Sequence, residues 1–311
     1  MARRRKGDKI DGWLVIDKPA GITSSAVVGR VKRALSAAKA GHAGTLDPLA
    51  TGVLPIALGE ATKTVAYAMA GAKRYRFTVR WGEERTTDDA EGEVTRHSAA
   101  RPTRDAIEAA LPRFVGELEQ VPPAYSAIKV EGRRAYDLAR AGELPELAAR
   151  TVRIDEIRLA ALPDADHAVF EVRCGKGAYM RGLVRDLAAA LGTYGHIAVL
   201  RRLSVGGFSE AQAISLEKIE TLGHSPAALE HLLPVETALA DIPALALTEI
   251  EAKLLKSGRP VQVLRSADRA KIEGIADGCM VCAISGGKPV ALVRVESDPV
   301  LQLHPVRVLN V

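Results

Sequence analysis

An isolated carboxylate is the first candidate for chemistry in this sequence. Residues 41–59 read GHAGTLDPLATGVLPIALG, and only His42 and Asp47 among them could titrate. A carboxylate among glycines and aliphatic side chains loses solvation, which raises its pKa unless a cation or hydrogen-bond donors compensate. Such a carboxylate is suited to act as a nucleophile. The same spacing is equally typical of an Asx turn, in which Asp47 would bond its own backbone beside Pro48.

The segment GKGAYMRG (175–182) contains two further candidates, Tyr179 and Arg181. Arg181 lies near the start of a predicted helix, where a surface arginine is the ordinary interpretation. Tyr179 could equally be a core aromatic residue, and His42 a hydrogen-bonded loop histidine. Residue types and spacing alone therefore leave the chemistry of these side chains open.

The cysteines do not indicate a metal site. The chain has three, Cys174, Cys279 and Cys282, a sparse count that fits a reducing compartment. Cys279 and Cys282 form a C-x-x-C, but ADGCMVCAIS (276–285) is typical of a strand, where residues three apart face opposite sides. Because no second Cys/His pair of suitable spacing accompanies them, we predict no metal.

Charge distribution suggests a polyanionic partner. The chain of 311 residues has a net charge of +5, and residues 1–40 hold ten Lys/Arg against three acids. This surplus fits a surface that follows phosphates. The basic start MARRRKGDK has no apolar region behind it, and no apolar run reaches the roughly 18 residues of a membrane helix. We therefore expect a cytoplasmic protein with no membrane partner.

Helical and strand-like segments alternate irregularly along the first 240 residues. KRYRFTVRWG (73–82) alternates as a strand, with Tyr75 on the apolar face and a basic opposite face. A helix is expected from Ser24 as N-cap, another over 61–70, and a third from Thr103 that buries Ile107, Leu111, Phe114 and Val115. Further strands are expected at 12–17, 53–58, 151–160, 167–174 and 196–207, a helix at 177–192, and an acidic turn at 86–93.

This mixture predicts an α+β fold on a largely antiparallel mixed sheet flanked by helices. The segment 121–143 is Pro-rich, then basic and helical in pattern, and is interpreted as an excursion from the core. From about residue 245 short apolar runs separated by turns predict a small β-rich domain. Neither G-x-x-x-x-G-K-[ST] nor a G-x-G-x-x-G after a strand is present, so nucleotide-driven and nicotinamide chemistry are not indicated.

Four motifs, taken together, resemble the TruB-type bacterial tRNA pseudouridine-55 synthases of the pseudouridine synthase superfamily. They are GWLVIDKPAGITS (12–24), GHAGTLDPLATGVLPIALGEATK (41–63), KRYRF (73–77) and CGKGAYMRGLVRDLAAALG (174–192). The resemblance covers roughly residues 12–210. It implies an isomerase that flips a T-loop uridine of tRNA out of its stack and converts it to pseudouridine.

The resemblance also implies roles for individual residues. Asp47 matches the catalytic nucleophile, and Arg181 the arginine that keeps it ionised. Tyr75 matches the tyrosine that stacks on the target base and accepts a proton late in the reaction. Tyr179 and the backbone of Leu200 match contacts to the uridine, and His42 matches the histidine that fills the space of the extruded base. Asp47 could attack either the uracil ring or the sugar carbon.

Domain organisation and partners follow from the same resemblance. The charge pattern predicts a basic disordered tail at 1–11. The resemblance implies a catalytic domain at 12–240, with an RNA-clamping insertion at about 121–150 that is expected to be mobile without RNA. Residues 245–311 would form an RNA-binding domain similar to PUA domains. The expected partner is the T-arm stem-loop of tRNA. No cofactor, no metal and no obligatory protein partner are expected, and the chain should be a monomer.

Three other classes of protein share part of this pattern. A non-catalytic protein that binds or folds tRNA would have the same basic surfaces, although it would not need Asp47, Tyr75 and Arg181 together. A guide-RNA-dependent pseudouridine synthase would share these residues and differ in requiring a ribonucleoprotein. A carboxylate-based glycosidase would want a second Asp or Glu beside Asp47, and the loop offers none.

Overall fold

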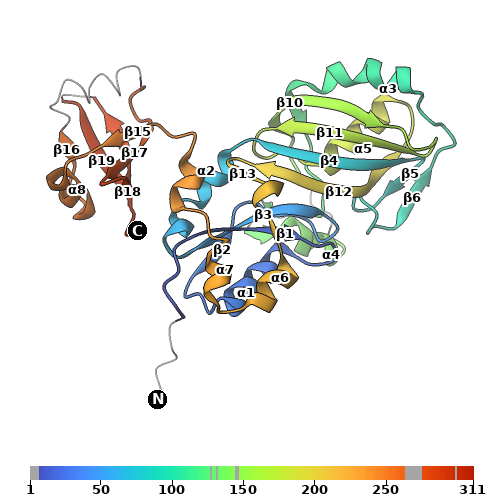
Figure 1. Cartoon of the computed structure of the whole chain (residues 1–311). Helices are drawn as coiled ribbons and strands as arrows, with labels where there is room; N and C mark the ends of the chain where they lie inside the picture. The colour runs from blue at the N-terminus through green and yellow to red at the C-terminus, as the bar shows by residue number, and fades with distance from the viewer. Residues whose placement is uncertain (1–6, 127, 131, 144–146, 263–274, 298–299) are drawn as a thin grey trace.

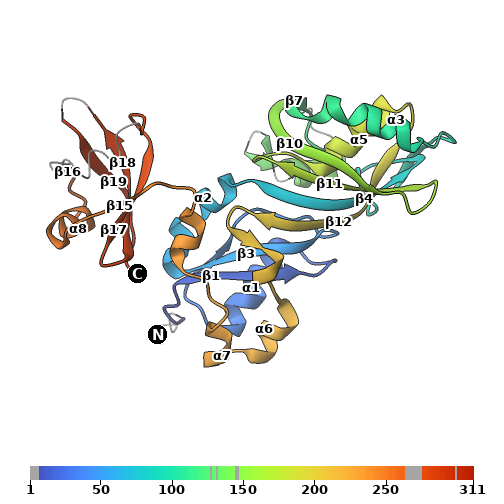
Figure 2. The same cartoon turned by 45° about the horizontal axis from the view of Figure 1, so that its top comes forward.

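Two β-sheets organise the chain. The computed structural model describes residues 7–126, 128–130, 132–143, 147–262, 275–297 and 300–311 (Figure 1). A large mixed sheet and its helices form the main body, and a smaller sheet formed from residue 244 onward stands beside it in both views (Figures 1 and 2). The predicted α+β class is confirmed.

The large sheet contains ten strands within the described residues, in the order β14-β1-β3-β12-β4-β11-β10-β7, with β2 added beside β3 and β13 beside β12. Only the β1–β14 and β3–β12 pairs are parallel, so the predicted antiparallel character is confirmed. The strands are β1 (Gly12–Lys18), β2 (Ala40–His42), β3 (Thr51–Leu58), β4 (Lys73–Trp81), β7 (Gly116–Gln120), β10 (Arg150–Ala161), β11 (His167–Cys174), β12 (Gly195–Val205), β13 (Phe208–Ser209) and β14 (Ile214–Ser215).

Helices cover the large sheet as the periodicity of their apolar residues requires. In both views α1, α6 and α7 lie beneath β1 and β3, whereas α3 and α5 lie beside β10 and β11 (Figures 1 and 2). The helices and 3₁₀ turns of this body are α1 (Ser24–Ala34), η1 (Gly59–Lys63), α2 (Val65–Ala70), α3 (Arg104–Ala110), η2 (Leu111–Phe114), α4 (Ala135–Arg140), α5 (Met180–Ala190), η3 (Glu210–Gln212), α6 (Leu216–Leu222), α7 (Pro226–Leu229) and η4 (Val235–Leu239).

The alternation predicted for β4 is confirmed. Phe77, Val79 and Trp81 are buried in the main core, and Tyr75 packs against the same core at its edge. The arginines of the opposite face are exposed, and Arg74 and Arg76 pair with Glu171 of β11 at 3.9 and 3.3 Å. The basic face of this strand is therefore partly neutralised within the protein.

Three helix predictions need correction. Thr23, rather than Ser24, caps α1 by accepting a hydrogen bond from the Ala26 amide. The helix predicted over 61–70 is η1 followed by α2. The helix from Thr103 ends in η2, because Pro112 cannot continue the hydrogen-bonding pattern, and Val115 beyond it is 45% exposed rather than buried.

The predicted excursion starts as irregular structure after β7. Among its described residues the helical structure is α4, which follows the short hairpin of β8 (Lys129–Val130) and β9 (Arg133–Arg134), so the basic part that was predicted to be helical is helical only in part. The hairpin forms at Gly132, whose φ of +84° suits a tight turn. Residues 127, 131 and 144–146 of this predicted insertion lie outside the described residues.

A five-stranded sheet and the β5–β6 hairpin lie outside the large sheet. The smaller sheet has the order β15-β17-β18-β19-β16 and packs on α8 (Glu249–Lys256), with Leu255, Val281 and Val293 in its core. Its strands are β15 (Ala244–Ala246), β16 (Val261–Gln262), β17 (Met280–Ser285), β18 (Lys288–Glu296) and β19 (Gln302–Val308). A separate hairpin of β5 (Glu83–Arg85) and β6 (Val94–His97) extends from β4.

The ends of the chain are only partly described. Residues 1–6 of the predicted tail, and 263–274 and 298–299 of the predicted C-terminal domain, lie outside the described residues. Asp8, by contrast, forms a bridge with Ala37, and its amide donates to the Ser36 carbonyl at 2.7 Å. Residues 7–11 are therefore part of the folded body rather than of a tail. Among the described helices, none is long and apolar enough to cross a membrane.

Candidate active site

The loop that holds Asp47 lies between β2 and β3 and is fixed by two side chains. The Ser24 hydroxyl accepts from the Leu46 amide at 2.8 Å and lies 3.0 Å from the Leu46 carbonyl. The fully buried ammonium of Lys18 donates to the carbonyls of Pro48 and Ala50 at 3.1 and 2.7 Å. The residues on both sides of Asp47 are thus held in place. Burial lowers the pKa of Lys18 to about 8, although the charge of Asp47 raises it.

Arg202 of β12 holds the same loop from the sheet side. Its Nε donates to the Val53 carbonyl at 2.8 Å and its Nη2 to the Gly44 carbonyl at 3.1 Å. Gly44 has a φ of +93°, and a Cβ there would lie 3.2 Å from Arg202 Nη1. A glycine at this position therefore permits both the turn and the close approach of the guanidinium.

Arg181, in the first turn of α5, pairs with Asp47. Its Nε lies 3.0 Å from Asp47 Oδ2, and its two remaining nitrogens donate to the carbonyls of Thr87 and Tyr125 at 2.9 and 2.8 Å. The arginine side chain is 4% exposed and the carboxylate 33%. Burial raises the pKa of Asp47, and the charge of Arg181 opposes that shift. One third of the Asp47 side chain therefore remains accessible, while the buried guanidinium of Arg181 compensates its negative charge.

A second buried carboxylate, Asp89, lies 3.7 Å from the same Nε of Arg181. Asp89 belongs to the acidic turn 86–93, which docks on β12, because the Ala90 amide donates to the Ile197 carbonyl at 2.9 Å. The Thr87 hydroxyl donates to Asp89 at 2.5 Å. The sequence predicted only a turn here. The one sequence feature that could have indicated a functional role for this turn was its pair of adjacent aspartates. That feature is too general to predict a contact with Arg181.

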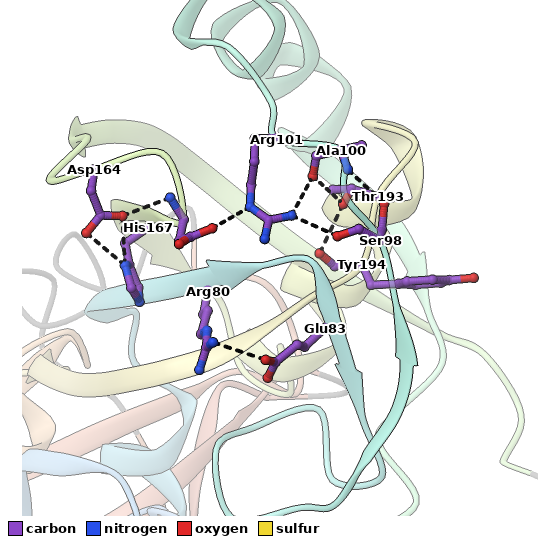
Figure 3. A network of polar contacts seen from close by, with 10 residues as sticks. Arg80, Glu83, Ser98, Ala100, Arg101, Asp164, His167, Thr193 and Tyr194 are labelled. Carbon is purple, nitrogen blue, oxygen red and sulfur yellow. Dashed lines mark hydrogen bonds and ion pairs between the residues drawn. The ribbon is translucent and has the colours of Figure 1, made fainter.

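The hairpin that leads into the acidic turn is anchored at both ends, as Figure 3 shows. Glu83 at the start of β5 pairs with Arg80 of β4 at 3.1 Å. Beyond β6, Arg101 pairs with Asp166 in the β10–β11 turn, and Thr193 donates to the Ala100 carbonyl at 3.0 Å. This network lies at the far end of β4 from Tyr75, yet it fixes the element that places Asp89.

Tyr75 and Tyr179 both lie near Asp47. Tyr75 stands opposite Arg202 in the β4–β12 register and is hydrogen-bonded to it. Burial raises the pKa of Tyr75, Arg202 opposes the shift, and the charge of Asp47 adds to it. Burial likewise raises the pKa of Tyr179, and the charge of Asp47 adds to that shift. The structure thus gathers three predicted residues, Tyr75, Tyr179 and Arg181, around the carboxylate of a fourth, Asp47.

The other two predicted residues lie on strands that border this cluster. Leu200 of β12 is opposite Phe77 of β4, and its carbonyl accepts from the Thr51 hydroxyl at 3.4 Å. His42 ends β2, opposite Ile56 of β3, and so stands at the start of the Asp47 loop. Their backbone positions agree with a place beside the loop.

In the described ranges no group of three or more His, Cys, Asp or Glu side chains is arranged to hold a metal ion. Cys279 is exposed just before β17, whereas Cys282 is buried within it.

Two protein-family models match the chain. Residues 32–180 match the model of the TruB family pseudouridylate synthase N-terminal domain, and residues 181–240 match that of the tRNA pseudouridylate synthase B C-terminal domain. Proteins named tRNA pseudouridine synthase B from Rhodospirillum rubrum and Gluconacetobacter diazotrophicus are 54% and 57% identical to the chain. These alignments cover 100% and 99% of the chain and the whole of each relative.

Solved structures support the fold alone. A Cbf5–Nop10–Gar1 complex contains a chain with 24% identity and a TM-score of 0.73, over 95% of this chain and 83% of that one. An H/ACA RNP bound to a substrate RNA contains a chain with 22% identity and the same TM-score, over 96% and 85%. The full-length relatives and the matched models are decisive: the chain belongs to the TruB family of pseudouridylate synthases.

Proposed function

We propose that the chain converts uridine to pseudouridine at position 55, in the T loop of tRNA. The single observation that supports this most directly is the Asp47–Arg181 ion pair at 3.0 Å in a loop otherwise poor in charge. The relatives are named as tRNA pseudouridine synthases, which supports tRNA as the substrate class. Position 55 and the T loop come from the motif resemblance.

The reaction is an isomerisation, so its atoms balance without a co-reactant. The C1′–N1 bond breaks, the uracil rotates and a C1′–C5 bond forms, while a proton leaves C5 and one is gained at N1. In the proposal Asp47 is the nucleophile, toward either the uracil ring or C1′, and regenerates when the new bond is complete. Arg181 favours the ionised carboxylate, which offsets the desolvation that raises the pKa of Asp47.

The other site residues are proposed to bind the target uridine once it has left its stack, or to fill the space that it leaves. The target uridine must leave its stack at a cost of a few kcal/mol. Tyr75 is proposed to stack on the flipped uracil and to accept the C5 proton late in the reaction. Tyr179 and the Leu200 backbone are proposed to contact the uridine, and His42 to occupy the space that the extruded base leaves.

RNA binding is proposed to use four regions. The exposed Lys32 and Arg33 of α1 and the arginines of β4 would contact phosphates. Residues 121–150 would close over the RNA, and the C-terminal region 245–311 would act as an RNA-binding domain similar to PUA domains. The small five-stranded sheet on α8 supports a separate folding unit there.

The enzyme is proposed to act as a monomer in the cytoplasm without a protein partner or guide RNA. High identity over the whole chain to relatives named as tRNA enzymes supports this over the guide-dependent alternative. An unmodified tRNA transcript distinguishes the two, because a guide-dependent enzyme would not act on it alone.

The test measures tritium release from a tRNA transcript made with 5-tritiated uridine. Wild type should release about one tritium per tRNA, whereas Asp47→Asn should bind the RNA and release none. Asp155→Asn is the matched control, because Asp155 is a partly buried aspartate of β10 that pairs with the exposed Arg153, and it should behave as wild type. No release by a folded wild type, or full release by Asp47→Asn, would contradict the proposal.

A further inference from the structure

Gln120 is a buried amide that no step above uses. It is the last residue of β7 and only 3% exposed. Its Nε2 donates to the Tyr179 carbonyl at 3.0 Å, and its Oε1 accepts from the Tyr179 amide at 2.8 Å. One side chain therefore binds both polar groups of a single residue, as a neighbouring strand would.

Tyr179 is a position where such support matters. It is the N-cap of α5, with an extended backbone (φ −102°, ψ 118°), and its own side chain makes no capping hydrogen bond to the helix. Its carbonyl also accepts from the Leu183 amide at 3.0 Å, so the Gln120 contact joins β7 to the first turn of the helix. Arg181, two residues later, leaves from that same turn. The conformation of the Tyr179 backbone consequently determines the positions of the Cα atoms from which the Tyr179 and Arg181 side chains extend.

The fit between Gln120 and α5 is close. A Cβ built on Gly182 would lie 3.2–3.3 Å from the Cδ, Cγ and Nε2 atoms of Gln120. Gly182 itself is buried in the first turn of α5. The absence of a side chain at this position is what allows the amide to reach Tyr179.

We propose that Gln120 is a positioning residue for catalysis. By fixing the Tyr179 backbone, it sets the Tyr179 ring and the Arg181 guanidinium relative to Asp47. This inference rests on the proposed roles of those three residues. Gln120 also directly precedes the predicted insertion, whose Tyr125 carbonyl accepts from Arg181 at 2.8 Å. The segment that leaves β7 therefore supports the same helix turn at a second point.

The first test replaces Gln120 with methionine, which has a similar length and forms no such hydrogen bonds. Misplacement of reacting groups by about 1 Å can slow a reaction on the order of 100-fold, so we expect a loss of roughly that size in the single-turnover rate. The dissociation constant for tRNA should change by less than about threefold, because the buried Gln120 offers almost no surface for RNA to contact. A rate within about twofold of wild type, or a loss confined to binding, would overturn the proposal.

Gln212→Met is the matched control. The Gln212 amide oxygen also accepts from a backbone amide, that of Ser209 at 2.9 Å, but in η3, away from α5. It should retain the wild-type rate. Wild type is the reference for both variants: an inactive wild type contradicts the proposed function, whereas an active wild type together with an active Gln120→Met contradicts only the role of Gln120.

A double-mutant cycle tests the proposal even where Gln120→Met folds poorly. Gly182→Ala places a methyl group against the Gln120 amide and should slow the single-turnover rate at least about tenfold. Combined with Gln120→Ala, which removes the obstructed amide, the same Gly182→Ala change should have an effect of less than about twofold. Equal effects of Gly182→Ala in both backgrounds would show that it does not act through Gln120 and would overturn the proposal.

Discussion

Two buried arginines lie on opposite sides of the Asp47 loop, and they are compensated differently. Arg181 contacts two carboxylates, Asp47 at 3.0 Å and Asp89 at 3.7 Å, as well as two backbone carbonyls. Arg202 is just as buried, yet in the described part of the chain its partners are carbonyls and the Tyr75 hydroxyl, with no acid among them.

The difference separates catalysis from scaffolding. A buried guanidinium between carboxylates keeps at least one of them ionised, which a nucleophile requires. A buried guanidinium that binds carbonyls instead fixes backbone segments, here the Gly44 turn and the start of β3 at Val53. It also leaves a positive charge that lowers the pKa of Lys18 and Lys73, in addition to the burial that brings each to about 8.

Arg181→Met should have the largest effect on the reaction. The change removes the main cation beside Asp47, so the pKa of the carboxyl should rise further and the nucleophile should be less often ionised. We expect the single-turnover rate to fall roughly 1000-fold, as for the loss of one electrostatic contact to a reacting group. Arg158→Met, on the exposed face of β10, is the control. A loss below about tenfold would show that Arg181 is not needed for the charge of Asp47.

Arg202→Met should affect stability more than chemistry. It leaves the buried Val53 carbonyl and the partly buried Gly44 carbonyl without their donor, and hydrogen bonds to charged groups contribute about 1.5–3 kcal/mol each. We expect the free energy of unfolding, measured in urea, to fall by about 3 kcal/mol, while the rate falls less than for Arg181→Met. The neighbouring Arg201, whose ion pairs with Asp17 and Glu210 are half-exposed, gives the control. Arg201→Met should lose about 1 kcal/mol or less. A larger loss of rate in Arg202→Met than in Arg181→Met would remove the distinction between these two buried arginines.

The sequence predicted much of the fold because its signals are periodic. The alternation of Phe77, Val79 and Trp81 indicated β4 and its buried face, and every long strand of the main sheet was expected within a few residues. Helix boundaries were less predictable. A single residue, Pro112, ends the regular helix of α3, and either of two adjacent hydroxyl residues, Thr23 and Ser24, could have been the N-cap of α1.

The site was predictable only in part. The isolation of Asp47 was visible in the sequence, but its partner Arg181 came from resemblance to a family, since no local pattern links residues so far apart. Asp89, Gln120 and Arg202 were missed. Their contacts join side chains to backbone groups or to a distant helix, and such contacts leave no periodic signal.

Asp89→Asn should have a smaller effect than Arg181→Met and Arg202→Met. It tests how the charge of Arg181 is divided between Asp47 and Asp89. The charge of Asp89 raises the pKa of Asp47, so its removal should lower that pKa. A nucleophilic carboxylate loses activity as the pH falls through its pKa; the acid limb of the single-turnover rate should therefore move to lower pH in Asp89→Asn. At neutral pH the rate should fall about tenfold, because Arg181 loses one of its anchors.

Asp88→Asn is the control for this shift. Burial raises the pKa of Asp88 to about 6, but this carboxylate pairs with Arg185 at 3.2 Å rather than with Arg181. Its replacement should leave the acid limb in place if that limb reports Asp47. An acid limb that disappears in Asp88→Asn would instead assign it to Asp88. A limb that stays unmoved in Asp89→Asn would show that Arg181 isolates Asp47 from the second carboxylate.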